Sequence, residues 1–263
     1  MTSALRVTNV VLGVLCAALA AGFLSRAPWA TRLWPFAALE TRLGFIFLGS
    51  IAAAIAAPTI WIGLSGEARA AEGGSINLMV TFWGMAVFLA ERGVGAGRPD
   101  LVHAAVVCAL LGAAVAWGFV TARRIPWRDE RPMPAFVRWS FLSFSVVLVL
   151  VAVALIARAP HVFPWPLARD SSVMYGWVFL GAAAYFAYGV FRPKWTNATG
   201  QLLGFLAYDL VLVAPFLKHF AIVNPAHRPS LVVYTAVLIY SAVLAAYYLF
   251  VHTSTRLAPA ADS

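Results

Sequence analysis

The sequence predicts an all-α integral membrane protein with eight transmembrane helices, arranged as two parallel four-helix repeats. Three observations lead to this fold class. Hydrophobic residues make up 62% of the 263 residues and charged residues only 11%, whereas a soluble domain carries about a quarter charged residues. Apolar runs of about 18 or more residues recur along the whole chain. A pattern of loop and helix residues occurs once in each half of the sequence.

Eight apolar runs are long enough to cross a bilayer as helices. Short stretches rich in proline, glycine and arginine separate them, as expected for turns between helices. Because these links are short, we expect consecutive helices to pack side by side and antiparallel. The expected spans are residues 7–24, 43–63, 75–92, 101–121, 139–157, 173–191, 200–218 and 230–251.

The repeated pattern covers the loop before the second and the sixth span, together with the first turns of each span. In the first half it reads RAP at 26–28, WP at 34–35, then Glu40 and GFIFLGS at 44–50. In the second half it reads RAP at 158–160, WP at 165–166, then Asp170 and GWVFLGA at 176–182. Four features in the same order favour an internal duplication over convergence on common loop chemistry.

The duplication predicts the topology and the domain organisation. Each copy holds four spans, an even number, so both copies enter the membrane from the same side and are related by an axis along the membrane normal. The N-terminal run also resembles a signal peptide, but its match to the span at 139–157 favours a retained helix. The expected units are a first repeat (1–121), a basic linker (122–138), a second repeat (139–252) and a polar C-terminal tail (253–263).

The net charge of +9 lies mainly in the short loops that flank the apolar runs. Basic residues in this position anchor and orient helices, so we expect the lipid bilayer as the partner and no nucleic acid. The 19 lysines and arginines divide almost equally between the two sides of the membrane. The arginine cluster in the linker favours both termini in the cytoplasm, and we expect a multi-pass protein of a bacterial-type plasma membrane.

Asp209 is the strongest single signal of function, because it lies near the middle of an apolar span. A charged residue there costs roughly 2.5–3.5 kcal/mol on insertion scales, and no acid or base on its own helical face neutralises it. Three roles are open: a hydrogen-bonded structural residue, a proton- or cation-binding group of a transporter, or a general acid. Burial favours the protonated form of a carboxyl, which is compatible with all three roles.

All eight tyrosines lie in the second half of the chain. A tyrosine hydroxyl in hydrocarbon needs a hydrogen-bond partner. We expect the five deeper tyrosines either to pack as core residues or to form a weakly polar aromatic pocket around the carboxyl. The candidate ligand-binding residues are Asp209, Tyr208, Tyr185, Tyr188, Tyr234, Tyr240 and Phe205.

Two further expectations concern helix packing and helix ends. The second span has a face of small residues that includes Gly49 and Ala53, and the seventh begins with the pair Gly200 and Gly204. Such faces let another helix backbone approach closely. The matched acids Glu40 and Asp170 precede or open a helix, where a carboxylate can accept hydrogen bonds from amide groups. We therefore expect both acids to act as caps in the headgroup region.

No motif in the sequence specifies a reaction, so the protein is assigned neither as an enzyme nor as a non-enzyme. CxxC, HExxH and pairs of mid-span histidines are absent, and we expect no metal or other cofactor. The preferred hypothesis is binding or transport of a hydrophobic or weakly polar small molecule between the two repeats, with Asp209 as the ionisable centre. The alternatives are a membrane-embedded enzyme that acts on a lipid or isoprenoid with Asp209 as general acid, and an accessory subunit with a membrane-protein partner.

Overall fold

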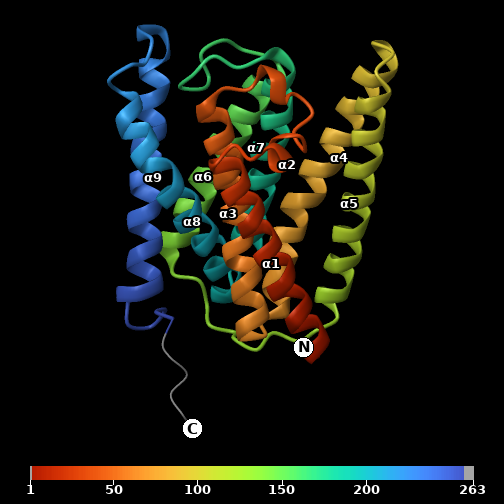
Figure 1. Ribbon diagram of the computed structural model, residues 1–263. Coiled ribbons are helices and arrows are strands. Elements are labelled where there is room, and N and C mark those ends of the chain that lie inside the picture. Colours follow the sequence, from red (N-terminus) through yellow and green to blue (C-terminus); the bar gives the residue numbers. More distant parts are fainter. Residues whose placement is uncertain (1, 258–263) are drawn as a thin grey trace.

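The computed structural model describes residues 2–257, and within that range the chain is all-helical without a β-strand. Eight helices are long and apolar enough to cross a membrane, as predicted, and they form an elongated bundle (Figure 1). Each begins one to five residues before its predicted start. They are α1 (Ser3–Leu24), α3 (Arg42–Ser65), α4 (Ala71–Gly95), α5 (Pro99–Arg123), α6 (Ala135–Ile156), α7 (Arg169–Phe191), α8 (Trp195–His219) and α9 (Arg228–Ala246).

Several short elements lie between the long helices. Proline occupies the first position of both α2 and η3, where its missing amide hydrogen costs nothing. Helix α9 continues into a π-helical turn, η4. Both described ends of the chain lie at the same end of the bundle (Figure 1); residues 258–263 of the predicted tail lie outside the described residues. The short elements are α2 (Pro28–Thr31), η1 (Ala37–Leu39), η2 (Ala68–Ala70), η3 (Pro225–His227) and η4 (Tyr247–Val251).

The long helices pack in pairs, and the pairs join the two halves of the chain. Helix α1 packs on α3, α4 on α5, α6 on α7 and α8 on α9. Between the halves, α3 packs along α8, and α4 along α7. By contrast, α3 and α4 make few contacts with each other, as do α7 and α8. The expectation that all consecutive helices pack along their length is therefore wrong for these two pairs, because a short link holds together only the ends that it joins. It is also wrong for α5 and α6, which the linker connects but which do not pack on each other.

Small residues allow the closest helix approaches. A Cβ atom on Gly63 of α3 would lie 2.8 Å from the carbonyl oxygen of Arg6 in α1. A Cβ atom on Gly204 of α8 would lie 3.0 Å from the carbonyl oxygen of Ala54 in α3. Backbones this close gain van der Waals contact that longer side chains would prevent. The glycine pair predicted on the seventh span thus includes the position where α8 meets α3, whereas Gly49 of the second span lies against Leu24 and Ala20 of α1.

The two RAP motifs form the same helix-ending turn. Arg26, after α1, has φ 56°, and Arg158, after α6, has φ 59°. In each turn the following alanine donates its amide hydrogen to a carbonyl five residues earlier, at 2.8 Å for Ala27 and 2.9 Å for Ala159. This is the hydrogen-bond pattern of a Schellman C-cap, which places its C′ residue in the left-handed region. Both arginines therefore occupy a backbone conformation that glycine adopts more readily.

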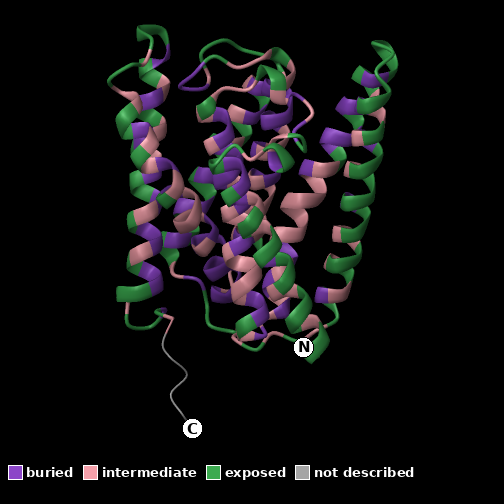
Figure 2. Ribbon diagram, in the orientation of Figure 1, coloured by how far each residue is buried: buried purple, intermediate pink, exposed green. Residues whose placement is uncertain are grey.

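Buried residues concentrate on the central helices α3, α7 and α8, and exposed ones cover the outer faces of α5 and α9 (Figure 2). Phe47 of α3 and Phe179 of α7 stack at the centre, with ring centroids 6.0 Å apart and an interplanar angle of 10°. Large apolar side chains also point outward, such as Trp117 of α5, which is 75% exposed. An apolar outer surface fits helices whose surroundings are lipid.

The basic linker between the halves lies across the end of the bundle that carries the described chain ends. Arg128 donates to the carbonyl of Ser65 at 2.9 Å, and Trp195 donates its amide hydrogen to the carbonyl of Arg131 at 2.8 Å. Arg6 also donates to the carbonyl of Gly63 at 3.1 Å. A guanidinium near the C-terminal carbonyls of a helix is favoured by the helix dipole. Part of the basic charge at this end therefore caps helices.

Candidate functional site

Asp209 is fully buried in α8. Neither of its carboxyl oxygens has a hydrogen-bond partner among the described residues. Ser241 of α9 lies beside it, but the Ser241 hydroxyl donates to the carbonyl of Val237 at 2.8 Å. An isolated buried carboxylate is strongly disfavoured in a medium of low polarity. The arrangement therefore favours a neutral, protonated carboxyl at Asp209. Such a carboxyl can both donate a hydrogen bond to a ligand and accept one from it.

Two of the predicted tyrosines lie close to Asp209. The hydroxyls of Tyr208 in α8 and Tyr234 in α9 form a hydrogen bond with each other, and both rings lie within electrostatic reach of the Asp209 carboxyl. Tyr208 packs edge-on against Phe47, with centroids 6.1 Å apart. Tyr234 packs against Phe216, with centroids 5.2 Å apart. The two tyrosine rings therefore belong to the central aromatic cluster, and their hydroxyls are bonded to each other and not to the Asp209 carboxyl.

Tyr240 and Phe205 lie in a different place. The Tyr240 hydroxyl is 2.7 Å from the hydroxyl of Ser140 in α6, and its side chain is exposed. Phe205 packs on Phe144 and Phe186 at centroid distances of 4.8 and 4.7 Å. Tyr240 lines a lateral groove of about 360 Å³ together with Phe136, Trp139, Ser140, Ser143 and Phe144. Asp209 does not line this groove.

Tyr185 and Tyr188 form a third group, at the interface of α7 with α4. A Cβ atom on Gly73 of α4 would meet the Tyr185 ring, so the missing side chain provides room for that ring. The Tyr188 hydroxyl donates to the carboxylate of Glu72. The seven candidate residues therefore occupy three separate places, and only Tyr208 and Tyr234 accompany Asp209.

Glu72 is a buried acid that sequence reasoning missed. It is 1% exposed, and Arg69 pairs with it at 2.5 Å. The Arg69 guanidinium also lies over the ring of Trp127, 4.9 Å from its centroid. The span predicted at 75–92 leaves Glu72 in the link before it, whereas the helical region begins at Ala68. The spacing of three residues between Arg69 and Glu72, typical of an ion pair on a helix, could have indicated the contact.

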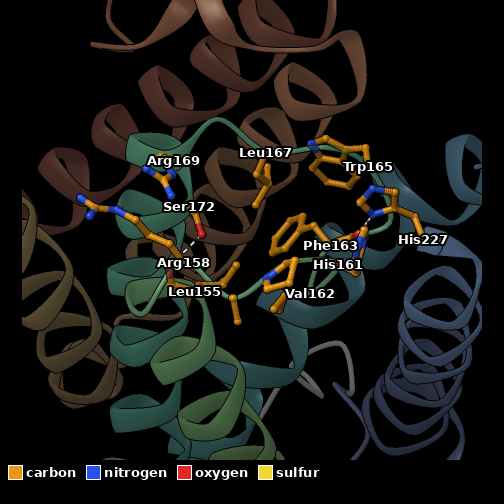
Figure 3. A pocket seen from close by; sticks show the side chains of 12 residues that line it. Leu155, Arg158, His161, Val162, Phe163, Trp165, Leu167, Arg169, Ser172 and His227 are labelled. Carbon is orange, nitrogen blue, oxygen red and sulfur yellow. Dashed lines mark hydrogen bonds between the residues drawn. The ribbon is translucent and has the colours of Figure 1, made fainter.

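A cavity of about 100 Å³ lies at the opposite end of the bundle, between the end of α6 and the start of α7 (Figure 3). His227 is held at its edge by a hydrogen-bond contact of 2.8 Å between Nδ1 and the carbonyl oxygen of Phe163. The rings of His161 and His227 pack edge-to-face, with centroids 4.8 Å apart. Sequence reasoning assigned the loop histidines no role. The lining residues are Leu155, Arg158, Ala159, Pro160, His161, Val162, Phe163, Trp165, Leu167, Arg169, Ser172 and His227.

The matched acids Glu40 and Asp170 differ in their surroundings, and neither is the cap that was expected. Thr41 caps α3, since its hydroxyl accepts the amide hydrogen of Gly44 at 3.0 Å. Glu40 instead accepts from Nε1 of Trp34 at 3.1 Å. Asp170 pairs with Arg92 and Arg158. A hydroxyl one residue after Glu40 reaches the first-turn amides better than the longer carboxyl side chain, and nearby guanidinium groups attract the carboxylate of Asp170.

Burial raises the pKa of the Glu40 carboxyl, although hydrogen bonding from neighbouring groups opposes the shift. The hydroxyls of Tyr175 and Ser171 face this carboxyl without reaching full hydrogen-bond geometry. Tyr175 also stacks on Trp34, with centroids 5.3 Å apart. Glu40 therefore lies at a contact between the first-half loop and α7.

Eight apolar helices in an all-helical chain define a polytopic integral membrane protein. Comparison of the chain with protein-family models, with curated proteins and with solved structures gave no match. The class of the protein therefore rests on its helices, and its activity has to be argued from the geometry of its sites.

Proposed function

We propose that the protein binds a hydrophobic or weakly polar small molecule within the membrane and transports it in a step coupled to protonation of Asp209. The observation that carries this proposal is the fully buried carboxyl without a hydrogen-bond partner among the described residues. A purely structural acid would be expected to have a partner, because a buried polar group without one is unfavourable. If Asp209 binds a proton or a ligand during function, its carboxyl has to be free of protein hydrogen bonds before that binding, which explains why it has no partner here.

The Tyr208–Tyr234 hydroxyl pair supports this role. Hydroxyl groups can both donate and accept, so a pair of them beside a carboxyl can pass a proton to or from it. The two tyrosine rings pack against the central aromatic cluster, where flat, polarisable rings offer a surface for a hydrophobic ligand. Ser241 supplies a further polar group on the α9 side.

We also propose that the two halves arose by duplication and are related by an axis along the membrane normal. The matched RAP turns share one hydrogen-bond pattern and one unusual backbone conformation. Exchanging the halves converts the α3–α8 contact into the α4–α7 contact, and the α1–α3 contact into the α6–α7 contact. Phe47 and Phe179, at the same place in the two GxxFLG motifs, stack on each other. These relations support a twofold arrangement with residues 1–121 and 139–252 as its units.

The proposed location is a bacterial-type plasma membrane with both termini in the cytoplasm. The linker arginines support this orientation, although some of them also cap helices. Labelling single cysteines in the linker and in the loop at residues 157–168, in intact cells with an impermeant reagent, tests it. Labelling of the loop alone is expected. Labelling of the linker alone would reverse the orientation.

Purified protein in liposomes tests the proposed transport. A panel of hydrophobic and weakly polar solutes is added while a trapped dye reports internal pH. At least one solute is expected to drive a proton flux, and Asp209→Asn should abolish that flux while the protein stays folded. Asp100→Asn, which removes an exposed carboxyl at the bundle end, is the matched control and should retain the flux.

Other outcomes of the same experiment distinguish the alternatives. Chemical conversion of a lipid or isoprenoid in the liposomes, lost in Asp209→Asn, would replace transport by catalysis. Absence of both flux and conversion, together with co-purification of a second membrane protein, would assign an accessory role. A proton flux that Asp209→Asn leaves unchanged would refute the role of this carboxyl.

A further inference from the structure

The cavity between α6 and α7 supports an inference that goes beyond the role proposed for Asp209. It lies at the end of the bundle opposite the described chain ends, where the second RAP…WP loop folds back between α6 and α7 (Figures 1 and 3). We propose that this cavity binds a carboxylate, either of a small organic acid or of a fatty acid at the membrane surface.

In the first half of the chain, a tryptophan already binds a carboxylate of the protein itself. There, Nε1 of Trp34 donates to the carboxylate of Glu40 at 3.1 Å. Trp165, in the second WP motif, is 3% exposed, and its Nε1 has no hydrogen-bond partner among the described residues. Its indole lines the cavity, beside Leu167 (Figure 3). A bound carboxylate would accept from Trp165 as Glu40 accepts from Trp34, and would satisfy a buried donor that is otherwise unfavourable.

The acid that matches Glu40 in sequence does not satisfy Trp165. Asp170 is held by Arg92 at 2.9 Å and by Arg158 at 3.6 Å. Both guanidinium groups lie on the α7 side of the loop, and Asp170 does not line the cavity. The second half of the chain therefore has the indole donor of the first half but a differently engaged acid.

Basic groups surround the cavity. Arg169 lies on one side of it, and His161 and His227 on the other (Figure 3). Arg158 also borders the cavity, but its guanidinium points away from it and pairs with Asp170. Arg169 forms no ion pair with any residue in the described part of the chain. Helix α7 begins here, and its N-cap, Ala168, provides no side-chain hydrogen bond to the first amide groups. The positive end of this helix therefore adds to the attraction for an anion.

The size and the walls of the cavity favour a carboxylate at the end of an apolar chain. Its volume of about 100 Å³ is well below the roughly 300–1,000 Å³ of sites for drug-sized ligands. Leu155, Val162, Phe163 and Leu167 form apolar walls next to the basic groups. Such a cavity can hold a carboxylate with its first methylene groups, while the rest of a longer chain would remain in the bilayer.

Binding of radiolabelled laurate to the full-length protein in detergent tests the proposal, with methyl laurate and acetate as competitors. Saturable binding that methyl laurate fails to displace is expected, because the ester lacks the charge. Displacement by acetate at millimolar concentration would identify a small acid as sufficient, whereas displacement only by long-chain acids would identify a membrane-surface ligand. Absence of saturable laurate binding, or displacement of laurate by methyl laurate as effective as that by unlabelled laurate, would overturn the assigned ligand class.

Substitutions locate the site. Arg169→Gln is expected to weaken laurate binding about tenfold or more, since charge-assisted hydrogen bonds are the strong ones. Trp165→Phe keeps an aromatic ring but removes the N–H donor, and should weaken binding several-fold. Arg98→Gln, at the same end of the bundle but outside the cavity, is the matched control. Equal binding in all three variants would refute the site.

A spectroscopic readout keeps the test valid if a variant folds poorly. In protein labelled with ¹⁵N-tryptophan, the indole N–H signal that disappears in Trp165→Phe should move when laurate is added to the native protein. The Trp34 signal should stay in place, because that N–H is already bonded to Glu40. An unmoved Trp165 signal at saturating laurate would overturn the proposal. Asp209→Asn should bind laurate normally, so this outcome is independent of the proposed transport.

Discussion

Phe47 and Phe179 occupy the same position in the two GxxFLG motifs, and their rings stack on each other at the centre of the bundle, 6.0 Å apart. Each phenylalanine lies on the second long helix of its half, α3 or α7. These two helices do not pack along each other, because α3 packs on α8 and α4 on α7. The two side chains therefore join the halves directly where the helix backbones are further apart.

The stacked pair predicts an energetic coupling between the two halves. In a double-mutant cycle, Phe47→Leu and Phe179→Leu should show a coupling of about 0.5–1.5 kcal/mol in the free energy of unfolding, since aromatic pairs gain this beyond burial alone. Denaturant unfolding in detergent measures it. The cycle of Phe47→Leu with Phe186→Leu is the control, because Phe186 belongs to a separate cluster. Additive effects in both cycles would contradict the coupling.

The close contact of α1 with α3 predicts a strong effect of a single methyl group. Gly63→Ala should lower the free energy of unfolding by about 1–3 kcal/mol, because its Cβ would lie 2.8 Å from the Arg6 carbonyl oxygen. Gly118→Ala places the same methyl group on α5, where no atom lies within 4 Å. That control should be neutral or stabilise by up to about 1 kcal/mol, as alanine is the better helix former. Similar losses in both variants would refute the assigned contact.

The left-handed backbone of the first RAP turn predicts an order of stabilities. Arg26→Gly should be more stable than Arg26→Ala by about 1 kcal/mol, because both variants lose the guanidinium but only glycine avoids the Cβ strain. Arg32 ends α2 with φ −64°, so Arg32→Ala should be at least as stable as Arg32→Gly. Thermal unfolding of the four variants compares them. An alanine variant that exceeds the glycine variant at Arg26 would contradict the turn geometry.

The raised pKa of Glu40 predicts how stability depends on pH. Below the usual value of 4.5 the carboxyl is protonated in both the folded and the unfolded chain. As pH rises above that value, the unfolded chain ionises first, so the stabilisation from the neutral carboxyl is progressively lost until the folded protein ionises as well. Stability should therefore fall as pH rises from about 4.5 through the higher pKa of the folded state.

Glu40→Gln tests this pH dependence. The amide cannot ionise, and its oxygen can still accept the hydrogen bond of Trp34, so the melting temperature should fall less between pH 4 and 7 than in the native protein. Glu130→Gln removes a negative charge from a side chain that is 70% exposed and serves as the control for loss of one charge. A steeper fall in Glu40→Gln would show that the ionised form of Glu40 stabilises the fold.

The eight helices could be read from the sequence, since hydrocarbon requires long apolar runs with every backbone group satisfied internally. The matched RAP turns were also visible there, and so was Asp209, because an acid among some twenty apolar residues is conspicuous without any knowledge of its neighbours. These features depend on composition and on short spacings along the chain. Local chemistry is enough to produce them.

The packing partners were decided only in three dimensions. The link between α3 and α4 is short, yet α3 packs on α8, because Ala54 and Gly204 allow their backbones to approach. Helix packing also separates the candidate tyrosines into three groups, because they lie on helix faces that pack against different neighbours. Trp34 and Trp165 are each followed by proline in a matched motif, but whether an indole finds an acceptor depends on which groups bind the nearby acids. Glu40 bonds to Trp34, while Arg92 and Arg158 hold Asp170. Side-chain contacts between distant segments depend on how all the helices pack together, and no short stretch of sequence determines that packing.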